Sequence, residues 1–130
     1  MIKHIWSLIC QNIIVDRNTN SISYINCLEE LTVPPLPVDF SLSLGIFTHI
    51  DPIEVFKIRI RLKKPDGTIK ELIVTEDYKL KTKKNRINFI LGITFDSSGE
   101  YHFLIDIKTD NVWESFNEIP LEVKVNKAGS

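Results

Sequence analysis

Apolar and polar positions alternate most regularly in the middle of the chain, over residues 55–75. Residues 56–63 place an apolar side chain at every second position and a basic one between, which is the period-two pattern of a strand with one buried face. The sequence KPDG at residues 64–67 follows, where proline presets the backbone for a turn and glycine accepts a positive φ. A second β-rich run over residues 68–75 completes a predicted hairpin, on which the other segments are expected to pack.

The N-terminal residues predict another hairpin. Residues 4–15 end in three consecutive β-branched residues, residues 22–31 are β-rich, and the segment between them has a turn-forming composition. If residues 17–20 form the loop, the numbers of directly opposed residues sum to 37. This register pairs Ile13 with Tyr24 on one face of the hairpin.

The two cysteines, Cys10 and Cys27, are directly opposed in the same register. Opposed residues can approach closely, but the geometry of a disulfide is demanding. No secretion signal is recognised in the sequence, and reducing compartments keep such thiols reduced. We therefore expect both thiols to be buried, reduced and close together. A metal site built on them is not favoured, because no histidine falls at ligand spacing from either cysteine.

The rest of the chain also predicts strands. Three prolines within residues 31–38 predict an extended crossover from one sheet to another. The lysine-rich residues 76–86 are predicted to form an exposed edge strand or a long loop. Trp113 and Phe116 are assigned to a transitional segment before the closing strand. Alternation predicts further strands over residues 40–48, 87–95, 101–108 and 119–125.

About eight strands without an amphipathic helix predict an all-β fold, an antiparallel immunoglobulin-like β-sandwich of about seven to nine strands. We expect a single β-sandwich domain over residues 1–126 and a disordered tail over residues 127–130. The tract SSGEYHFLIDI resembles the penultimate strand of immunoglobulin-like domains, where a glycine turn precedes an inward tyrosine. The side chains expected to point inward are Phe56, Ile58, Ile60, Phe89, Tyr101, Phe103 and Ile105.

The order of these segments resembles that of a known family. An ICQNIIVD strand, a VPPLPV crossover, a KKPDGT hairpin and an SGEYHFLI strand follow one another along the chain. The arrangement is similar to an uncharacterised family of short bacterial β-sandwich proteins, known only as a domain of unknown function, and the resemblance covers residues 5–125. It implies a cytoplasmic bacterial protein with an immunoglobulin-like fold. It carries over no catalytic or binding residue.

Charge is distributed unevenly along the chain, although the net charge is −1. Residues 1–56 hold 2 basic and 6 acidic side chains, residues 57–86 hold 11 and 4, and residues 87–130 hold 3 and 7. The basic segment has two interpretations: its charges are cancelled by acidic neighbours across the sheet, or they form a face for an anionic partner. The candidate anion-binding residues are Lys57, Arg59, Arg61, Lys63, Lys79, Lys81, Lys83, Lys84 and Arg86.

The motifs of common catalytic and cofactor sites do not occur in the sequence. The three histidines form no HxH or HExxH group, the serines lie in no GxSxG elbow, and each glycine stands alone rather than in a phosphate loop. The DSSGE turn at residues 96–100 lacks the alternating acidic positions of a calcium loop. We therefore expect no catalytic, cofactor-binding or metal-binding residues, no cofactor and no enzyme. A site assembled from distant strands is the enzyme alternative that remains open.

No apolar run reaches the roughly 18 residues of a membrane-spanning helix, and the run over residues 5–10 is short for a signal core. We expect a cytoplasmic protein without a membrane partner. The favoured function is a non-catalytic protein–protein interaction or structural module with an unknown protein partner. The alternative is binding of an anion or a nucleic acid through residues 57–86, although we expect nucleic acids not to bind. If Asp106 and Glu122 lie beside residues 57–63, they cancel much of the positive charge there and the alternative is disfavoured.

Overall fold

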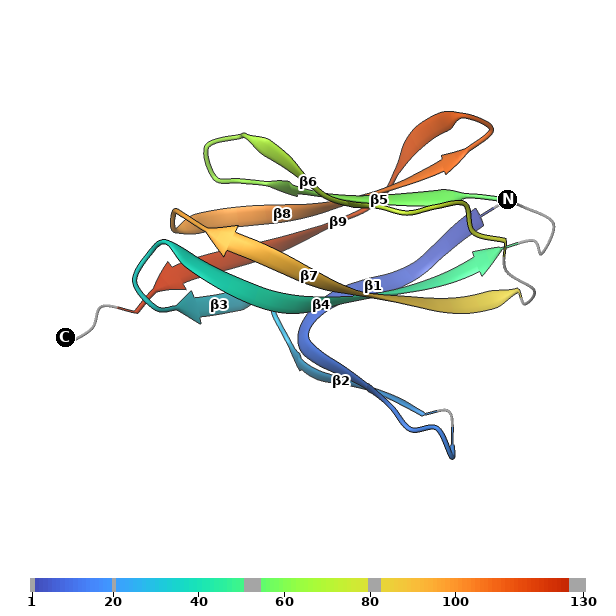
Figure 1. Ribbon diagram of the computed structural model, residues 1–130, viewed down its shortest axis with the longest axis horizontal. Helices are drawn as coiled ribbons and strands as arrows, with labels where there is room; N and C mark the ends of the chain where they lie inside the picture. The colour runs from blue at the N-terminus through green and yellow to red at the C-terminus, as the bar shows by residue number, and fades with distance from the viewer. Residues whose placement is uncertain (1, 20, 51–54, 80–82, 127–130) are drawn as a thin grey trace.

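The computed structural model describes residues 2–19, 21–50, 55–79 and 83–126, and this part of the chain contains nine strands and no helix (Figure 1). The strands are β1 (Ile2–Val15), β2 (Ile22–Cys27), β3 (Glu30–Val33), β4 (Val38–Ile50), β5 (Lys57–Lys63), β6 (Ile69–Val74), β7 (Lys84–Phe95), β8 (Gly99–Thr109) and β9 (Val112–Val125).

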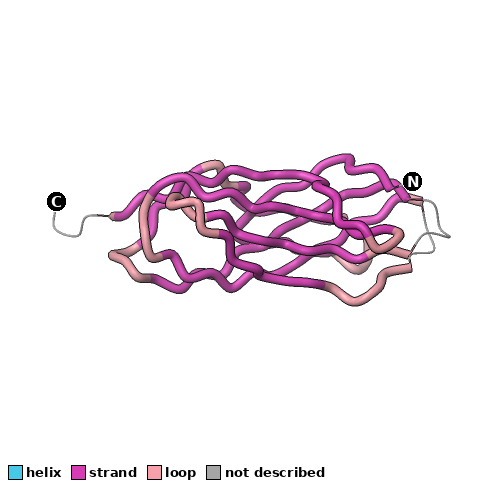
Figure 2. The backbone as a smooth tube through the Cα atoms, turned by 90° about the horizontal axis from the view of Figure 1, so that it is seen from above, coloured by secondary structure: helices cyan, strands magenta, loops and turns pink. Residues whose placement is uncertain are grey.

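The strands form two sheets that pack face to face along the long axis of the molecule (Figures 1 and 2). The four-stranded sheet has the order β2-β1-β4-β7, and the five-stranded sheet has the order β3-β9-β8-β5-β6. The predicted all-β sandwich of seven to nine strands is confirmed. One ladder differs from the expectation, since β3 pairs with β9 in parallel while the other ladders are antiparallel. The immunoglobulin-like strand order remains a prediction.

The core lies between the sheets and is built from every second residue of the long strands. Ile58, Ile60 and Leu62 point inward from β5, so the basic residues between them lie on the outer face of the five-stranded sheet. Each fully buried aliphatic or aromatic side chain stabilises the fold by about 1.5–3 kcal/mol. Of the seven side chains expected inside, Phe89 is only half-buried, and six are at most 1% exposed: Phe56, Ile58, Ile60, Tyr101, Phe103 and Ile105.

The predicted central hairpin is confirmed as β5 and β6. The N–H of Gly67 donates a hydrogen bond to the carbonyl of Lys64 at 2.9 Å, and Gly67 has a φ of 90°. A tight turn followed by a left-handed glycine matches the right-handed twist of the two strands. Asp66 Oδ1 accepts a hydrogen bond from the N–H of Thr68 at 2.8 Å, which fixes the turn further.

Tyr101 near the start of β8 is fully buried, as expected from the glycine turn before it. Its hydroxyl donates a hydrogen bond to the carbonyl of Ser97 at 2.6 Å, four residues upstream. A buried tyrosine bonded to the backbone just before its own strand resembles the tyrosine corner of immunoglobulin-like sandwiches. The contact anchors the turn between β7 and β8.

The register predicted for the first hairpin is confirmed, because Cys10 is opposite Cys27 and Val15 is opposite Ile22. Beyond Cys10, β1 leaves the sandwich with β2 as a projecting arm (residues 11–19 and 21–27; Figure 1).

The prediction of one continuous strand over residues 22–31 is wrong, since Leu28 and Glu29 belong to no strand and separate β2 from β3. After the break, β3 joins the other sheet, where Leu31 and Val33 are buried in the core. The proline-rich segment then crosses back to β4, as predicted.

The end of the lysine-rich segment forms an edge strand, one of its two predicted forms, because β7 begins at Lys84 at the edge of the four-stranded sheet and pairs with β4. One further boundary differs from the sequence prediction. The strand β9 begins at Val112 and includes Trp113 and Phe116, because residues 110 and 111 have φ angles of 51° and 63° that reverse the chain at once. The predicted disordered tail over residues 127–130 lies outside the described residues.

Candidate functional site

The candidate anion-binding residues of β5 share the outer face of the five-stranded sheet with an acidic residue of β8. Asp106 is opposite Arg59 and only 5% exposed. Its Oδ2 lies 3.0 Å from Nη2 of Arg59 and 2.9 Å from Nη2 of Arg61. Arg59 also lies over the ring of Trp113 at 4.4 Å from the ring centroid. These contacts hold both arginines flat against the sheet and cancel part of their charge.

Of the other candidate anion-binding residues, those of β7 are not brought together with those of β5, whereas Lys79 follows Tyr78, which forms a bridge with Phe56 directly before Lys57. Lys84 and Arg86 belong to β7 in the four-stranded sheet, where Arg86 lies over the ring of Phe47 at 5.0 Å. Lys79 and Lys83 are exposed in the connection before β7, and Lys81 lies outside the described residues.

Two acidic residues decide between the interpretations of β5: Asp106 lies beside β5 and Glu122 does not. Glu122 belongs to β9, and it is opposite Glu100 and Glu30. The charge cancellation expected for β5 therefore comes from Asp106.

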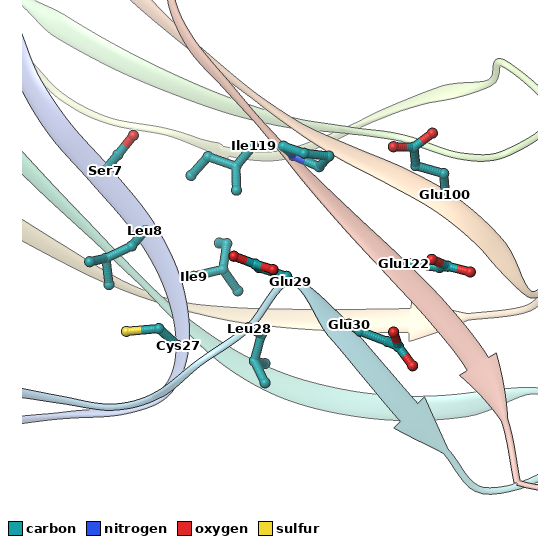
Figure 3. A pocket seen from close by; sticks show the side chains of 11 residues that line it. Ser7, Leu8, Ile9, Cys27, Leu28, Glu29, Glu30, Glu100, Ile119 and Glu122 are labelled. Atoms are coloured by element: carbon teal, nitrogen blue, oxygen red, sulfur yellow. The ribbon is translucent and has the colours of Figure 1, made fainter.

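A groove of about 760 Å³ lies on another part of the molecule, between β1, the β2–β3 connection, β3 and β9 (Figure 3). Its apolar lining comes from both sheets, and three of its four carboxylates, Glu30, Glu100 and Glu122, lie on the side of β3, β8 and β9 (Figure 3). We call it the acidic groove. It is lined by Ser7, Leu8, Ile9, Cys27, Leu28, Glu29, Glu30, Glu100, Ile119, Pro120 and Glu122.

The acidic groove lies where two long strands have an uncovered flank. The short strand β3 pairs only with residues 122–125 of β9, which leaves residues 112–121 without a ladder on that side in the described part of the chain. In the same way, β2 pairs with β1 only from Cys10 onward. Strand flanks of this kind carry backbone N–H and C=O groups that have no ladder partner, although Pro120 on the flank of β9 has no N–H to donate.

Three carboxylates form a row across the wall of the acidic groove. Glu100, Glu122 and Glu30 are directly opposed on β8, β9 and β3. Like charges in such positions repel and destabilise the sheet. Nζ of Lys124 lies 2.9 Å from Oε1 of Glu30, and this hydrogen bond, together with the charges of Glu30 and Glu122, raises the pKa of Lys124. One lysine cannot neutralise the whole row and Glu29 beside it.

A series of hydrogen bonds that the sequence did not indicate joins Asn117, Ser7 and His4 at the other side of the acidic groove. Nδ2 of Asn117 donates to Oγ of Ser7, and Oγ of Ser7 lies 2.9 Å from Nε2 of His4. Burial lowers the pKa of His4, which keeps the imidazole neutral and able to accept the hydroxyl proton of Ser7. Residues three apart on a regular strand face opposite sides, but a register shift between His4 and Trp6 brings His4 and Ser7 together.

The hydrogen bonds of Ser7 serve to join the two sheets, because Ser7 lies on β1 and Asn117 on β9. The ring of His4 also packs edge-on against Phe116 of β9, with ring centroids 5.1 Å apart. A serine nucleophile would need a base that a third group orients. Among the contacts of the described residues, none supplies such a group to His4.

The chain matches no protein-family model, and a search of curated proteins finds no significant match. The resemblance to an uncharacterised bacterial family therefore remains a prediction from the sequence. Within the described ranges, no group of three or more histidine, cysteine or acidic residues is arranged to hold a metal ion. The same residues include no helix of the length and apolarity required to cross a membrane.

Proposed function

We propose that the protein is a non-catalytic protein-binding module and that the acidic groove is its recognition surface. One observation carries the proposal: a groove with an apolar lining lies between uncovered flanks of two long strands and holds more carboxylates than the nearby lysine can neutralise. Uncovered flanks offer backbone hydrogen-bonding groups, and apolar pockets beside them accept alternate side chains. Sites that bind an extended peptide segment combine these two features.

The chemistry of the acidic groove favours an extended segment that carries lysine or arginine. A segment in line with β3 would continue the ladder along residues 112–121 of β9, ahead of Glu30, where β3 begins. Its basic side chains would lie near Glu29, Glu100 and Glu122 and would relieve the repulsion between these carboxylates. Its apolar side chains, at alternate positions, would contact the apolar lining that includes Leu8 and Ile119.

The alternative of anion or nucleic-acid binding through residues 57–86 has less support. Asp106 cancels part of the charge of β5, and the basic residues of β7 belong to the other sheet. We expect mixed-sequence DNA and RNA not to bind in a fluorescence-anisotropy titration at two salt concentrations. Binding at micromolar protein that weakens steeply with salt would favour the alternative, because each neutralised phosphate releases counterions.

The alternative of an enzyme also has less support, and its best candidate group is Ser7 with His4. We expect the native protein not to react with a fluorophosphonate probe, which labels activated serines. Labelling that is lost in Ser7→Ala and in His4→Phe would favour a hydrolase instead.

We place this module in the cytoplasm of a bacterium. The bacterial source follows from the resemblance in sequence alone. Location of a fluorescently tagged copy in the source organism tests this part of the proposal.

Selection from a random peptide library tests the recognition surface although the natural partner is unidentified. The library is selected on the native protein, and a double variant that reverses two groove charges, Glu29→Lys with Glu122→Lys, serves for counter-selection. A second double variant, Glu76→Lys with Glu114→Lys, makes the same change in net charge at exposed residues outside the groove. We expect enriched peptides that bind the wild type and the second variant but not the first. Failure to enrich any peptide would overturn the proposed function.

A further inference from the structure

The base of the projecting arm brings the two cysteines together. Cys10 is opposite Cys27 in the last pair of the β1–β2 ladder, where β1 also pairs with Ser43 of β4. Directly opposed residues of antiparallel strands have Cβ atoms about 4.5–5.5 Å apart, close to the roughly 3.5–4.5 Å of a disulfide. Both thiols are free in the structure. A small approach of the two side chains is therefore enough to join them.

Hydrogen bonds on both sides of the cysteine pair keep the two strands together. On the side of the sandwich, the N–H of Leu28 donates to the carbonyl of Ile9 at 2.8 Å. On the side of the arm, Nδ2 of Asn26 donates to Oε1 of Gln11 at 2.7 Å. These bonds keep the backbones of the two cysteines opposite each other.

The two thiols differ in their access to solvent, so the prediction that both are buried is wrong for Cys27. Cys10 is fully buried and its Sγ donates a hydrogen bond to the carbonyl of Asn12 at 3.3 Å, whereas Cys27 is exposed. Burial, and to a lesser degree the neighbouring Cys27, raises the pKa of the Cys10 thiol. A reagent in solution therefore meets Cys27 first, and Cys10 is positioned to react with what forms there.

We propose that Cys10 and Cys27 form a reversible dithiol–disulfide site that a low-molecular-weight disulfide, such as oxidised glutathione, converts. The thiolate of Cys27 attacks one sulfur of oxidised glutathione, breaks its S–S bond and releases one glutathione, which leaves a mixed disulfide on Cys27. The thiolate of Cys10 then attacks Sγ of Cys27 and releases the second glutathione. In total, two protein thiols lose two electrons and two protons, and oxidised glutathione is reduced to two molecules of glutathione.

The disulfide would join β2 to β1 at the place where the arm meets the four-stranded sheet. The arm is held there by Tyr24, whose ring packs edge-on against Trp6 at 5.2 Å between centroids. Farther out, Ile14, Val15 and Ile25 are 47%, 51% and 37% exposed. A two-stranded arm without a third strand is marginally stable in water, so a covalent link at its base restricts its opening. This site does not depend on the proposed function.

Mass measurement of the native protein after exposure to oxidised glutathione tests the proposal. The sample is then unfolded and treated with an alkylating agent. We expect the wild type to lose the mass of two hydrogen atoms, to take up no alkylating agent, and to return to the dithiol form when a reductant is added. In Cys10→Ser, we expect one glutathione to remain on Cys27. In Cys27→Ser, the buried Cys10 should stay unmodified until the chain is unfolded.

Three results with the wild type would overturn the proposal: a stable mixed disulfide on Cys27, two thiols that are still open to alkylation, or a disulfide between two chains. Circular dichroism before oxidation confirms that each variant is folded. If a serine variant does not fold, the measurements on the wild type still decide whether the proposal holds, because they need no variant.

Discussion

Replacement of Tyr101 by phenylalanine tests how much the buried hydrogen bond between Tyr101 and Ser97 stabilises the sandwich. The hydroxyl of Tyr101 is buried and donates to the carbonyl of Ser97 at 2.6 Å. In Tyr101→Phe this hydrogen bond is lost, together with the longer contacts of the hydroxyl with the N–H and Oγ of Ser97, which costs about 1.5 kcal/mol of unfolding free energy. For a domain of 130 residues, such a loss lowers the thermal midpoint by roughly 5 °C.

Tyr24→Phe is the matched control, because it removes the same atom from a different environment. The hydroxyl of Tyr24 is buried, yet it has no hydrogen-bond partner among the described residues. Its removal leaves the contact of the ring with Trp6 in place and ends the cost of an unpaired polar group, so the stability should stay the same or rise by up to about 1 kcal/mol.

Urea unfolding followed by circular dichroism measures both changes, and an unchanged slope against urea shows that the comparison is valid. The reasoning predicts a clear loss for Tyr101→Phe and no loss for Tyr24→Phe. Equal losses in the two variants would refute it, since the difference in hydrogen bonding would then have no energetic effect.

Three further predictions follow from buried polar groups. Thr48 is fully buried and its hydroxyl has no partner within the described part of the chain, so Thr48→Val should stabilise the protein by about 1 kcal/mol in urea unfolding. Asp106→Asn leaves two partly exposed arginines without their shared counter-charge and should cost about 2 kcal/mol in the same assay; no change would mean that the pairs contribute nothing. Burial lowers the pKa of His4 from 6.5, so the unfolded chain binds more protons than the folded one below about pH 6.5. The contribution of neutral His4 to the free energy of unfolding is therefore lost as the pH falls from 6.5. Between pH 7.5 and 5.5, the thermal midpoint of the wild type should fall further than that of His4→Gln.

Much of the fold could be predicted because its rules are local. Alternation along residues 56–63 fixes which side chains face the core, and KPDG fixes the turn that follows. The register of the first hairpin followed from the length of its loop, which is why the opposition of Cys10 and Cys27 was predicted correctly.

The errors concern the places where the chain changes partner. The short strand β3 looks like a continuation of β2 in the sequence, but Leu31 and Val33 are buried only if the chain bends at Leu28 and joins β9 in the other sheet. No local pattern encodes that choice. The strand β9 begins already at Val112 because Asp110 and Asn111 adopt positive φ angles. Aspartate and asparagine are common in turns of any length, so the sequence does not show that this turn is so short.

The acidic groove could not be predicted, since its parts come from distant segments. The row of Glu100, Glu122 and Glu30 exists only because β8, β9 and β3 are neighbours in one sheet. The contact between His4 and Ser7 exists only because the strand is irregular between them. The basic residues are visible in the sequence pattern, but the position of Asp106 beside two of them depends on the pairing of β5 with β8.

The affinity of the strongest selected peptide for three forms of the protein tests the proposed function most directly. Fluorescence anisotropy at physiological salt gives Kd for the wild type, for Glu29→Lys with Glu122→Lys, and for the control Glu76→Lys with Glu114→Lys. We predict that reversal of the two groove charges weakens binding by about tenfold or more, equivalent to about 1.4 kcal/mol, while the control changes Kd by less than about twofold. Equal weakening in both double variants, or none in either, would contradict the assignment of the acidic groove as the binding surface.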